Sequence, residues 1–125
     1  MKLERTLKMG MVGGGPDAFI GDVHRKAARM DGGIDIVAGV FSRVHKKGQE
    51  TARQLLIDPR RLYNNYAELV EKERQLPEGE RLDFVSIVTP NNSHFPTAKA
   101  LLEAGFHVMC EKPMTLNVQE ARELE

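Results

Sequence analysis

The strongest constraint on the fold is a regular alternation of short apolar runs with longer segments that show helical spacing. The apolar runs occupy residues 7–12, 34–41, 83–89 and 106–110. Two of them, residues 34–41 and 83–89, are rich in β-branched residues, and residues 34–41 are apolar at nearly every position, which is typical of a strand covered on both faces of a parallel sheet. Neighbouring parallel strands need long crossover connections, and the helical segments between the runs supply them. We therefore predict a doubly wound α/β sheet.

Helical spacing occurs in five segments, at residues 19–30, 45–56, 66–76, 93–105 and 117–125. The apolar positions that recur at helical spacing in the first segment, and so predict its buried face, are Ile20, Val23, Ala27 and Met30. Residues 58–65 indicate a turn that holds at most a very short strand.

Composition excludes several classes of function. Eighteen basic and 18 acidic residues give a formal net charge of zero, so we expect no basic surface for nucleic acid and no polybasic membrane anchor. The sequence has no apolar run long enough to span a bilayer. The single cysteine, Cys110, cannot form an intramolecular disulfide, which favours a reducing compartment. We expect one domain of 125 residues, in the cytoplasm, without a metal site.

The topology predicts where a ligand binds. Doubly wound sheets bind ligands beyond the carboxyl ends of their strands, at the point where the strand order reverses. These ends fall at residues 12–15, 41–43, 88–92 and 110–113. The candidate functional residues are therefore sought in these four segments.

The stretch MVGGGPDAFIGDVH places glycines directly after the first strand. A dinucleotide-binding turn needs one glycine to bend the chain, one to let the pyrophosphate reach the backbone and one to pack the helix closely. Gly13 and Gly15 suit the first two roles. Either Ala18 takes the third at the usual spacing, or Gly21 does, with PDA as an insertion. We prefer Gly21, because a glycine inside a helix costs about 1 kcal/mol relative to alanine unless close packing requires it.

The end of the second strand bears on the choice of cofactor. NAD-binding folds usually place an acidic residue here for the ribose hydroxyls, whereas this chain has Phe41, Ser42 and Arg43. Ser42 could donate to a 2′-phosphate and Arg43 could pair with it, so we favour NADP slightly over NAD. Equally, Ser42 could cap the next helix and Arg43 could be a solvated surface charge. Asp17 suits a pyrophosphate site only if it points away, for example to cap the helix near Phe19.

Two later motifs resemble a known family. The stretch VSIVTPNNSHFPTAKALLEAGFHVMCEKP, residues 85–113, carries T-P-N-x-x-H and E-K-P. Together with GGG…FIGDVH it resembles the N-terminal half of the glucose–fructose oxidoreductase / inositol dehydrogenase family, the Gfo/Idh/MocA oxidoreductases. The resemblance covers residues 7–125, with the motifs in the right order at successive strand ends. It implies that residues 1–125 form a Rossmann domain binding NAD or NADP. It also implies a parent dehydrogenase that moves hydride between the cofactor and a hydroxyl of a sugar, polyol or related small molecule.

The resemblance assigns roles to particular residues. The glycine turn would grip the pyrophosphate through Gly13, Gly15 and Gly21, with Phe19 and Ile20 beside them. The Thr-Pro-Asn segment would contact the cofactor near its ribose and pyrophosphate through Thr89, Pro90 and Asn91.

In the E-K-P motif the resemblance implies that Lys112 is catalytic, reaching the nicotinamide end and the substrate hydroxyl. Glu111 would hold the nicotinamide ribose and Lys112, and Pro113 would fix the bend. The chemistry agrees, because an ammonium at a strand end can polarise a carbonyl or favour an alkoxide as hydride moves. Alone, His24 indicates a helix surface residue and His94 the first residue of a helix, and the family's motifs place both near the site.

The resemblance also implies a second domain that binds the substrate and supplies acid/base residues. The sequence ends at Glu125 inside a helix, so we expect a truncated piece that lacks the last strand of its sheet and turns over almost no substrate. Its exposed sheet edge would favour homo-oligomers. One alternative is a non-catalytic dinucleotide-binding regulator or sensor, against which Lys112 argues. Another is a structural α/β domain without a ligand.

Overall fold

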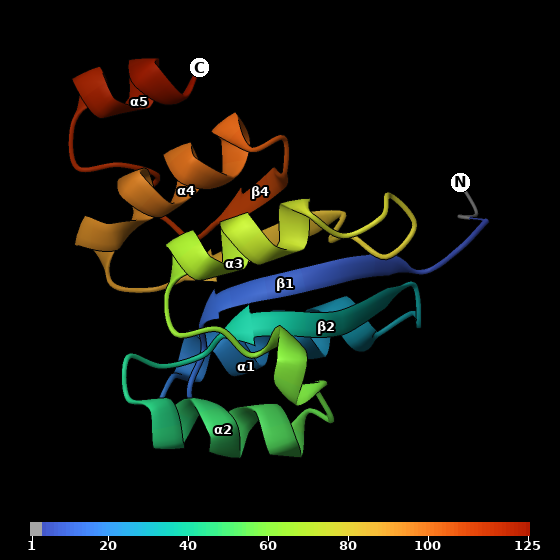
Figure 1. The fold of residues 1–125 in the computed structure, drawn as a ribbon. Coiled ribbons are helices and arrows are strands. Elements are labelled where there is room, and N and C mark those ends of the chain that lie inside the picture. The colour runs from blue at the N-terminus through green and yellow to red at the C-terminus, as the bar shows by residue number, and fades with distance from the viewer. Residues whose placement is uncertain (1–3) are drawn as a thin grey trace.

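The protein is described by a computed structural model that covers residues 4–125 (Figure 1). The strands are β1 (Leu7–Gly13), β2 (Ile34–Val40), β3 (Phe84–Val88) and β4 (His107–Cys110). The α-helices are α1 (Phe19–Arg29), α2 (His45–Gln54), α3 (Tyr66–Arg74), α4 (His94–Glu103) and α5 (Val118–Leu124). Two short 3₁₀ turns complete the order, η1 (Pro59–Arg61) before α3 and η2 (Asn91–Ser93) before α4. The domain predicted over residues 1–125 includes residues 1–3, which lie outside the described part of the chain.

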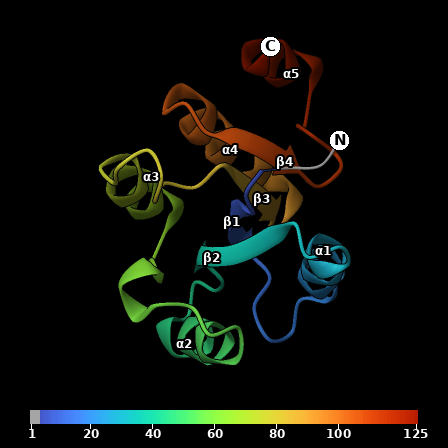
Figure 2. The same cartoon turned by 90° about the vertical axis from the view of Figure 1, so that its right-hand side faces the viewer.

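The four strands of the described residues form one parallel sheet in the order β2-β1-β3-β4. Figure 2 shows α1 on one side of this sheet and α3 and α4 on the other. The doubly wound α/β sheet predicted from the sequence is therefore confirmed. The strand order reverses between β1 and β3, so the ends of these two central strands are where a ligand is expected.

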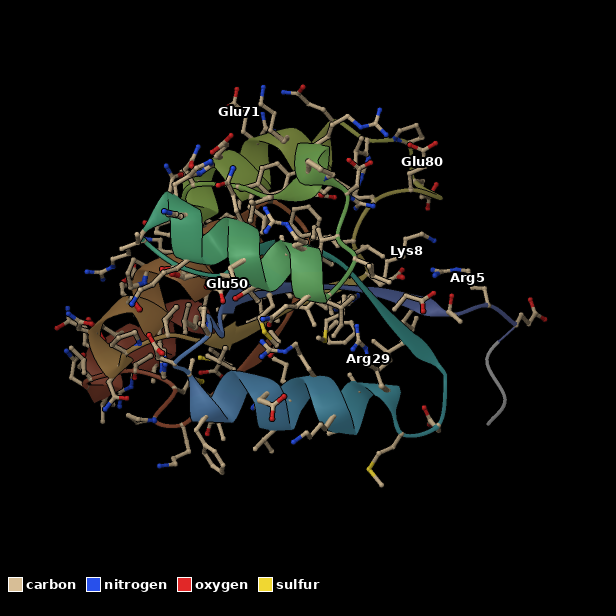
Figure 3. All side chains as sticks on the ribbon, turned by 90° about the horizontal axis from the view of Figure 1, so that it is seen from below. Arg5, Lys8, Arg29, Glu50, Glu71 and Glu80 are labelled. Atoms are coloured by element: carbon tan, nitrogen blue, oxygen red, sulfur yellow. The ribbon has the colours of Figure 1, made fainter. Side chains whose placement is uncertain are left out.

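Two apolar clusters hold the layers together, one on each face of the sheet. Successive side chains of β1 pack into opposite clusters: Met11 belongs to the cluster under α1 and α2, and Val12 to the cluster under α3 and α4. Leu69 of α3 and Leu101 of α4 are fully buried in the second cluster. Full burial of one such leucine stabilises the fold by about 1.5–3 kcal/mol. Charged side chains such as Glu71 lie on the outer surface (Figure 3).

The predicted buried face of α1 is wrong except at Ile20, which is partly buried and packs against the cluster under α1 and α2. Val23 is 40% exposed and Met30, which caps the helix, is 87% exposed, whereas Gly21 and Ala28 are buried. The helix is turned so that its small residue packs against the glycine turn and His24 reaches polar partners in the sheet. Contacts with distant segments therefore override apolar periodicity.

Several local predictions agree with the structure. Gly105 follows α4 with a φ of 88°, and the Asn117 side chain accepts the Glu120 N–H at 2.8 Å to cap α5. The short strand expected in residues 58–65 is a single parallel bridge between Leu62 and Gly39 of β2. Helices long and apolar enough to cross a membrane are absent from the described residues.

Candidate functional site

A cavity of about 640 Å³ opens beyond the carboxyl ends of β1, β2 and β3. Its position at the reversal of strand order is the one that the topology predicts. Six predicted site residues line it: Gly13, Gly15, Ser42, Arg43, Thr89 and Pro90. The other predicted residues lie outside its lining: Phe19, Ile20, Gly21, Asn91, Glu111, Lys112 and Pro113. The structure thus brings together the residues of three strand ends and places those after β4 to one side.

The glycine turn depends on missing side chains. Gly13 and Gly14 have φ values of 93° and 78°, in the left-handed region that favours glycine. A Cβ on Gly13 would lie 2.9 Å from the backbone of Val88, and one on Gly15 would lie 2.8 Å from the carbonyl oxygen of Phe41. Glycine at these positions therefore lets the turn sit directly against the ends of both neighbouring strands.

The third glycine packs the helix against the turn. A Cβ on Gly21 would meet Gly14 Cα at less than 3.0 Å, a separation that real Cβ atoms do not show. Ala18 instead stands at the N-cap of α1, where its N–H donates to the Gly15 carbonyl. The close packing expected of Gly21 is therefore confirmed, but its partner is the turn and not the sheet. Arg25 adds a hydrogen bond of 2.7 Å from its guanidinium to the Gly14 carbonyl, and burial lowers the Arg25 pKa.

Asp17, which the sequence left open, does not cap α1, whose N-cap has no side-chain hydrogen bond. Its carboxylate accepts a hydrogen bond of 3.1 Å from Lys47 of α2, and both residues line the cavity. The acid beside the proposed phosphate site is therefore paired with a cation. The first backbone N–H groups of α1 are left without a side-chain acceptor, as an anion-binding helix end requires.

The second strand end places its polar residues at the cavity. The Ser42 hydroxyl accepts the Val44 N–H at 3.1 Å, but the N-cap of α2 is Val44, so Ser42 does not cap that helix. Ser42 also lines the cavity. Arg43 is exposed at the cavity wall. Among the described residues, the α2–α3 connection contributes Asn64 and Asn65 to the same wall. Sequence reasoning missed these two, although the short strand suspected beside them was a signal that this segment runs along β2.

The third strand end is held by local hydrogen bonds. The Ser93 hydroxyl donates to the Pro90 carbonyl at 2.8 Å and accepts from the Thr89 hydroxyl, whose Oγ1 lies 2.6 Å away. His94, the first residue of α4 as expected, is fully buried. Its Nε2 lies 2.8 Å from the Thr89 carbonyl and its Nδ1 lies 2.7 Å from the Pro113 carbonyl. The T-P-N segment is therefore linked through His94 to the E-K-P segment.

The fourth strand end carries the E-K-P segment. Glu111 accepts the Lys112 N–H at 3.1 Å with Oε1 and a hydrogen bond of 2.9 Å from His24 with Oε2. The hydrogen bond from His24, aided by the Lys112 N–H, lowers the pKa of Glu111 below its ordinary value. The peptide bond between Lys112 and Pro113 is cis, and the Lys112 side chain is exposed. The reading of His24 alone as a surface residue is wrong, because its side chain is 17% exposed.

The described residues hold no cluster of side chains suited to a metal ion. What they offer is a glycine turn, a helix end whose N-cap makes no side-chain hydrogen bond, and a largely apolar cavity at the switch point that has a few polar side chains in its lining. This combination suits a dinucleotide, whose pyrophosphate needs N–H donors and whose adenosine needs a groove beyond the strand ends. The shape of the site therefore agrees with the ligand that the sequence predicts.

Comparisons with known proteins bear on the same point. The family model described as "Oxidoreductase family, NAD-binding Rossmann fold" (GFO_IDH_MocA) matches residues 7–125. The chain is 36% identical over 124 residues to the uncharacterized oxidoreductase YfiI of Bacillus subtilis, covering 98% of the chain and 31% of that protein. It is 32% identical over 126 residues to a D-xylose 1-dehydrogenase (NADP(+)) of Hypocrea jecorina, covering 95% of the chain and 30% of that protein.

A solved structure is also similar. It is an inositol dehydrogenase homolog from Azotobacter vinelandii, complexed with NADH and myo-inositol, with a TM-score of 0.93 and 41% identity. The match covers 98% of this chain and 32% of that one. The chain therefore spans less than a third of the length of each of these three proteins.

Proposed function

This chain belongs to the Gfo/Idh/MocA oxidoreductase family, and from that premise we propose that it serves as the cofactor domain of a dehydrogenase. The enzyme would move hydride between a nicotinamide dinucleotide and a hydroxyl group of a sugar, a polyol or a related small molecule. Relatives named for xylose and a homolog complexed with myo-inositol support this substrate class. Because the chain spans less than a third of these relatives, the activity belongs to the whole enzyme.

The observation that carries the proposal is the glycine turn at the switch point. Gly14 and Gly21 bring the amino end of α1 directly behind the cavity, where its free N–H groups and positive dipole end suit a pyrophosphate. Thr89 and Pro90, at the end of β3, line the same cavity beside Gly13. We propose that the pyrophosphate lies across Gly13 and Gly15, with Phe19 and Ile20 beside it.

The nicotinamide supplies or accepts the hydride when it is bound. In the proposed mechanism Lys112 supplies a positive charge and a proton donor for the substrate oxygen. A nearby ammonium favours the alkoxide that forms when the hydroxyl loses its proton and that becomes the carbonyl as hydride leaves; in the reverse direction it polarises the carbonyl and protonates the alkoxide. Glu111 would meet the nicotinamide ribose, and the proposed role of Asn91 is a further contact beside Thr89 and Pro90.

The choice between NAD and NADP rests on the end of β2. No acidic residue follows Phe41 directly, and the exposed Arg43 lines the cavity. Lys47 adds a second cation there, although it is paired with Asp17. We therefore propose a preference for NADP, in which Arg43 pairs with the 2′-phosphate and Ser42 donates to it.

Calorimetric titration with NADPH and NADH tests both proposals. We expect both cofactors to bind, and Arg43→Ala to weaken NADPH binding about tenfold while leaving NADH unchanged, as expected for one charge-assisted contact. Arg53→Ala, which removes an exposed cation at the other end of α2, is the matched control. Equal losses for the two cofactors would overturn the 2′-phosphate role, and absence of binding to either would overturn the function.

Two coarser expectations also remain proposals. We propose a cytoplasmic protein, which is the compartment that a single free cysteine favours. We also propose association between copies, because β4 is an edge strand and Met109 on it is 53% exposed. Sedimentation at several concentrations would detect such association.

A further inference from the structure

We propose that His24 and His94 are positioning residues that hold the segment Glu111–Pro113 from two sides and so determine where Lys112 stands. The importance of that placement for catalysis rests on the proposed function. The contacts that carry the inference do not: they join α1, β3 and α4 to the one segment that follows β4.

His24 holds the segment at Glu111. A carboxylate only accepts, so the ring must donate from Nε2–H to Glu111 Oε2, at 2.9 Å. In a neutral ring Nδ1 then carries no hydrogen and accepts from the hydroxyl of Ser86, at 2.8 Å. Ser86 is fully buried in β3, so the donor at the start of this chain of hydrogen bonds is anchored in the centre of the sheet. At the far end, the second oxygen of Glu111 accepts the Lys112 N–H.

This arrangement is more specific than helix packing requires. His24 lies 62 residues from Ser86 and 87 residues from Glu111 along the chain, and it satisfies both with one ring. The hydrogen bond from His24, aided by the Lys112 N–H, lowers the pKa of Glu111, in agreement with a carboxylate that accepts both hydrogen bonds. A side chain that only filled space between α1 and the sheet would need neither partner.

His94 holds the segment at Pro113. Its ring is fully buried and lies between the Thr89 and Pro113 carbonyl oxygens, at 2.8 and 2.7 Å. Carbonyl oxygens only accept, so the ring donates from at least one of its two nitrogens. Whichever nitrogen carries the hydrogen, the ring lies against both carbonyl oxygens and ties the end of β3 to the segment after β4.

These contacts fix the backbone position of Lys112, which lies between the two residues that the histidines hold. Lys112 has Glu111 before it and Pro113 after it, while its own side chain is exposed. The backbone is thus anchored on both sides and the ammonium remains free to reach outward. A catalytic amine needs this combination, because misplacement by about 1 Å can cost about 100-fold in rate.

Amide hydrogen exchange followed by ¹⁵N NMR tests the role of His24. We expect His24→Leu to raise the exchange rate of the Lys112 amide about threefold or more, as for loss of one hydrogen bond. His24→Gln should restore part of the protection, because the glutamine amide can still donate to Glu111. His45→Leu is the matched control, since His45 bonds only to Asn64, away from this segment. The Tyr63 amide, which donates to Gly39, is the internal reference. An unchanged rate at Lys112 in His24→Leu would overturn the role of His24.

The same spectra test His94. We expect order parameters of Lys112 and Met114 to fall from about 0.85 toward 0.6 in His94→Gln. Unchanged order parameters in the folded glutamine variant would overturn the role of His94. His94→Gln is used instead of His94→Leu, because leucine would remove every side-chain donor from a fully buried site.

Titration of the unaltered protein with NADPH separates this inference from the function on which it rests. Absence of cofactor binding together with the expected dynamics would refute the proposed function and leave the anchoring of Lys112 supported. Cofactor binding together with unchanged dynamics in the variants would support the proposed function and refute the anchoring of Lys112.

Discussion

Replacing Gly21 with alanine tests the packing that positions the glycine turn. The new Cβ would lie less than 3.0 Å from Gly14 Cα and 3.3 Å from the Arg25 guanidinium. Carbon atoms in contact prefer about 3.5–4.0 Å, so α1 and the turn must separate by more than about 0.5 Å. Because the closest atom belongs to the backbone, no side-chain rotation can relieve the contact.

Two opposing effects set the magnitude. Alanine is favoured over glycine inside a helix by about 1 kcal/mol. Overpacking of a tightly packed site costs about 1–3 kcal/mol, and the upper part of that range applies where backbone meets backbone. We therefore expect Gly21→Ala to lower the free energy of unfolding by about 1–2 kcal/mol. Weaker dinucleotide binding should accompany it, because Gly14 moves with the turn.

Gly48→Ala is the matched control, since Gly48 is also a buried glycine within a helix. A Cβ there would meet Leu62 Cδ1 at 3.7 Å, an ordinary contact. The same gain in helix propensity then applies without a clash, and we expect stabilisation of up to about 1 kcal/mol. Urea unfolding with unchanged m-values measures both variants. If Gly21→Ala were as stable as the unaltered protein, the packing argument would fail.

Three further outcomes are expected. Glu73→Ala should lower the free energy of unfolding, measured in urea, by about 3 kcal/mol or more. The reason is that fully buried Glu73 accepts hydrogen bonds from Arg61 at 2.6 and 2.9 Å and from the Tyr63 hydroxyl at 2.8 Å. A loss under about 1 kcal/mol would contradict this. The Arg5 guanidinium lowers the Asp83 pKa to about 2, so the Arg5–Asp83 pair stabilises the folded protein fully above pH 3.8 and loses this effect as pH falls toward 2. In Asp83→Asn the corresponding loss of stability between pH 3.8 and 2, at most about 1 kcal/mol for so exposed a pair, should disappear. Burial raises the pKa of Cys110, so iodoacetamide should alkylate it more slowly at pH 8 than it alkylates free cysteine, and an equal rate would refute the effect.

The strands and helices were predictable because their signals are local. A β-branched run such as residues 34–41 favours a strand through its own side chains, and an asparagine before a helical segment, such as Asn117, can cap it without help from elsewhere. Strand ends follow from the same patterns, which is why Gly13, Arg43 and Thr89 could be assigned to one side of the molecule before the structure was known. Their contacts with a cofactor remain predictions.

The orientation of α1 could not be read in this way. Apolar periodicity pointed to Val23 and Met30, but the helix is turned by a close approach at Gly21 and by the hydrogen bonds of His24. Neither cause has a local signature, because the partners lie in other elements. The Asp83 carboxylate shows the same limit: it accepts hydrogen bonds from the Arg5 guanidinium and from the Lys8 backbone N–H, and only the fold brings it to these two residues, which lie near one another in Figure 3.

The sequence by itself determined the order of elements, the parallel sheet and the strand ends where chemistry can occur, because short-range preference and handedness leave few alternatives for a chain patterned in this way. Only the tertiary structure decided how those ends are held. His24 and His94 act across long chain separations, and a hydrogen bond between distant residues exists only once the sheet has brought them within about 3 Å.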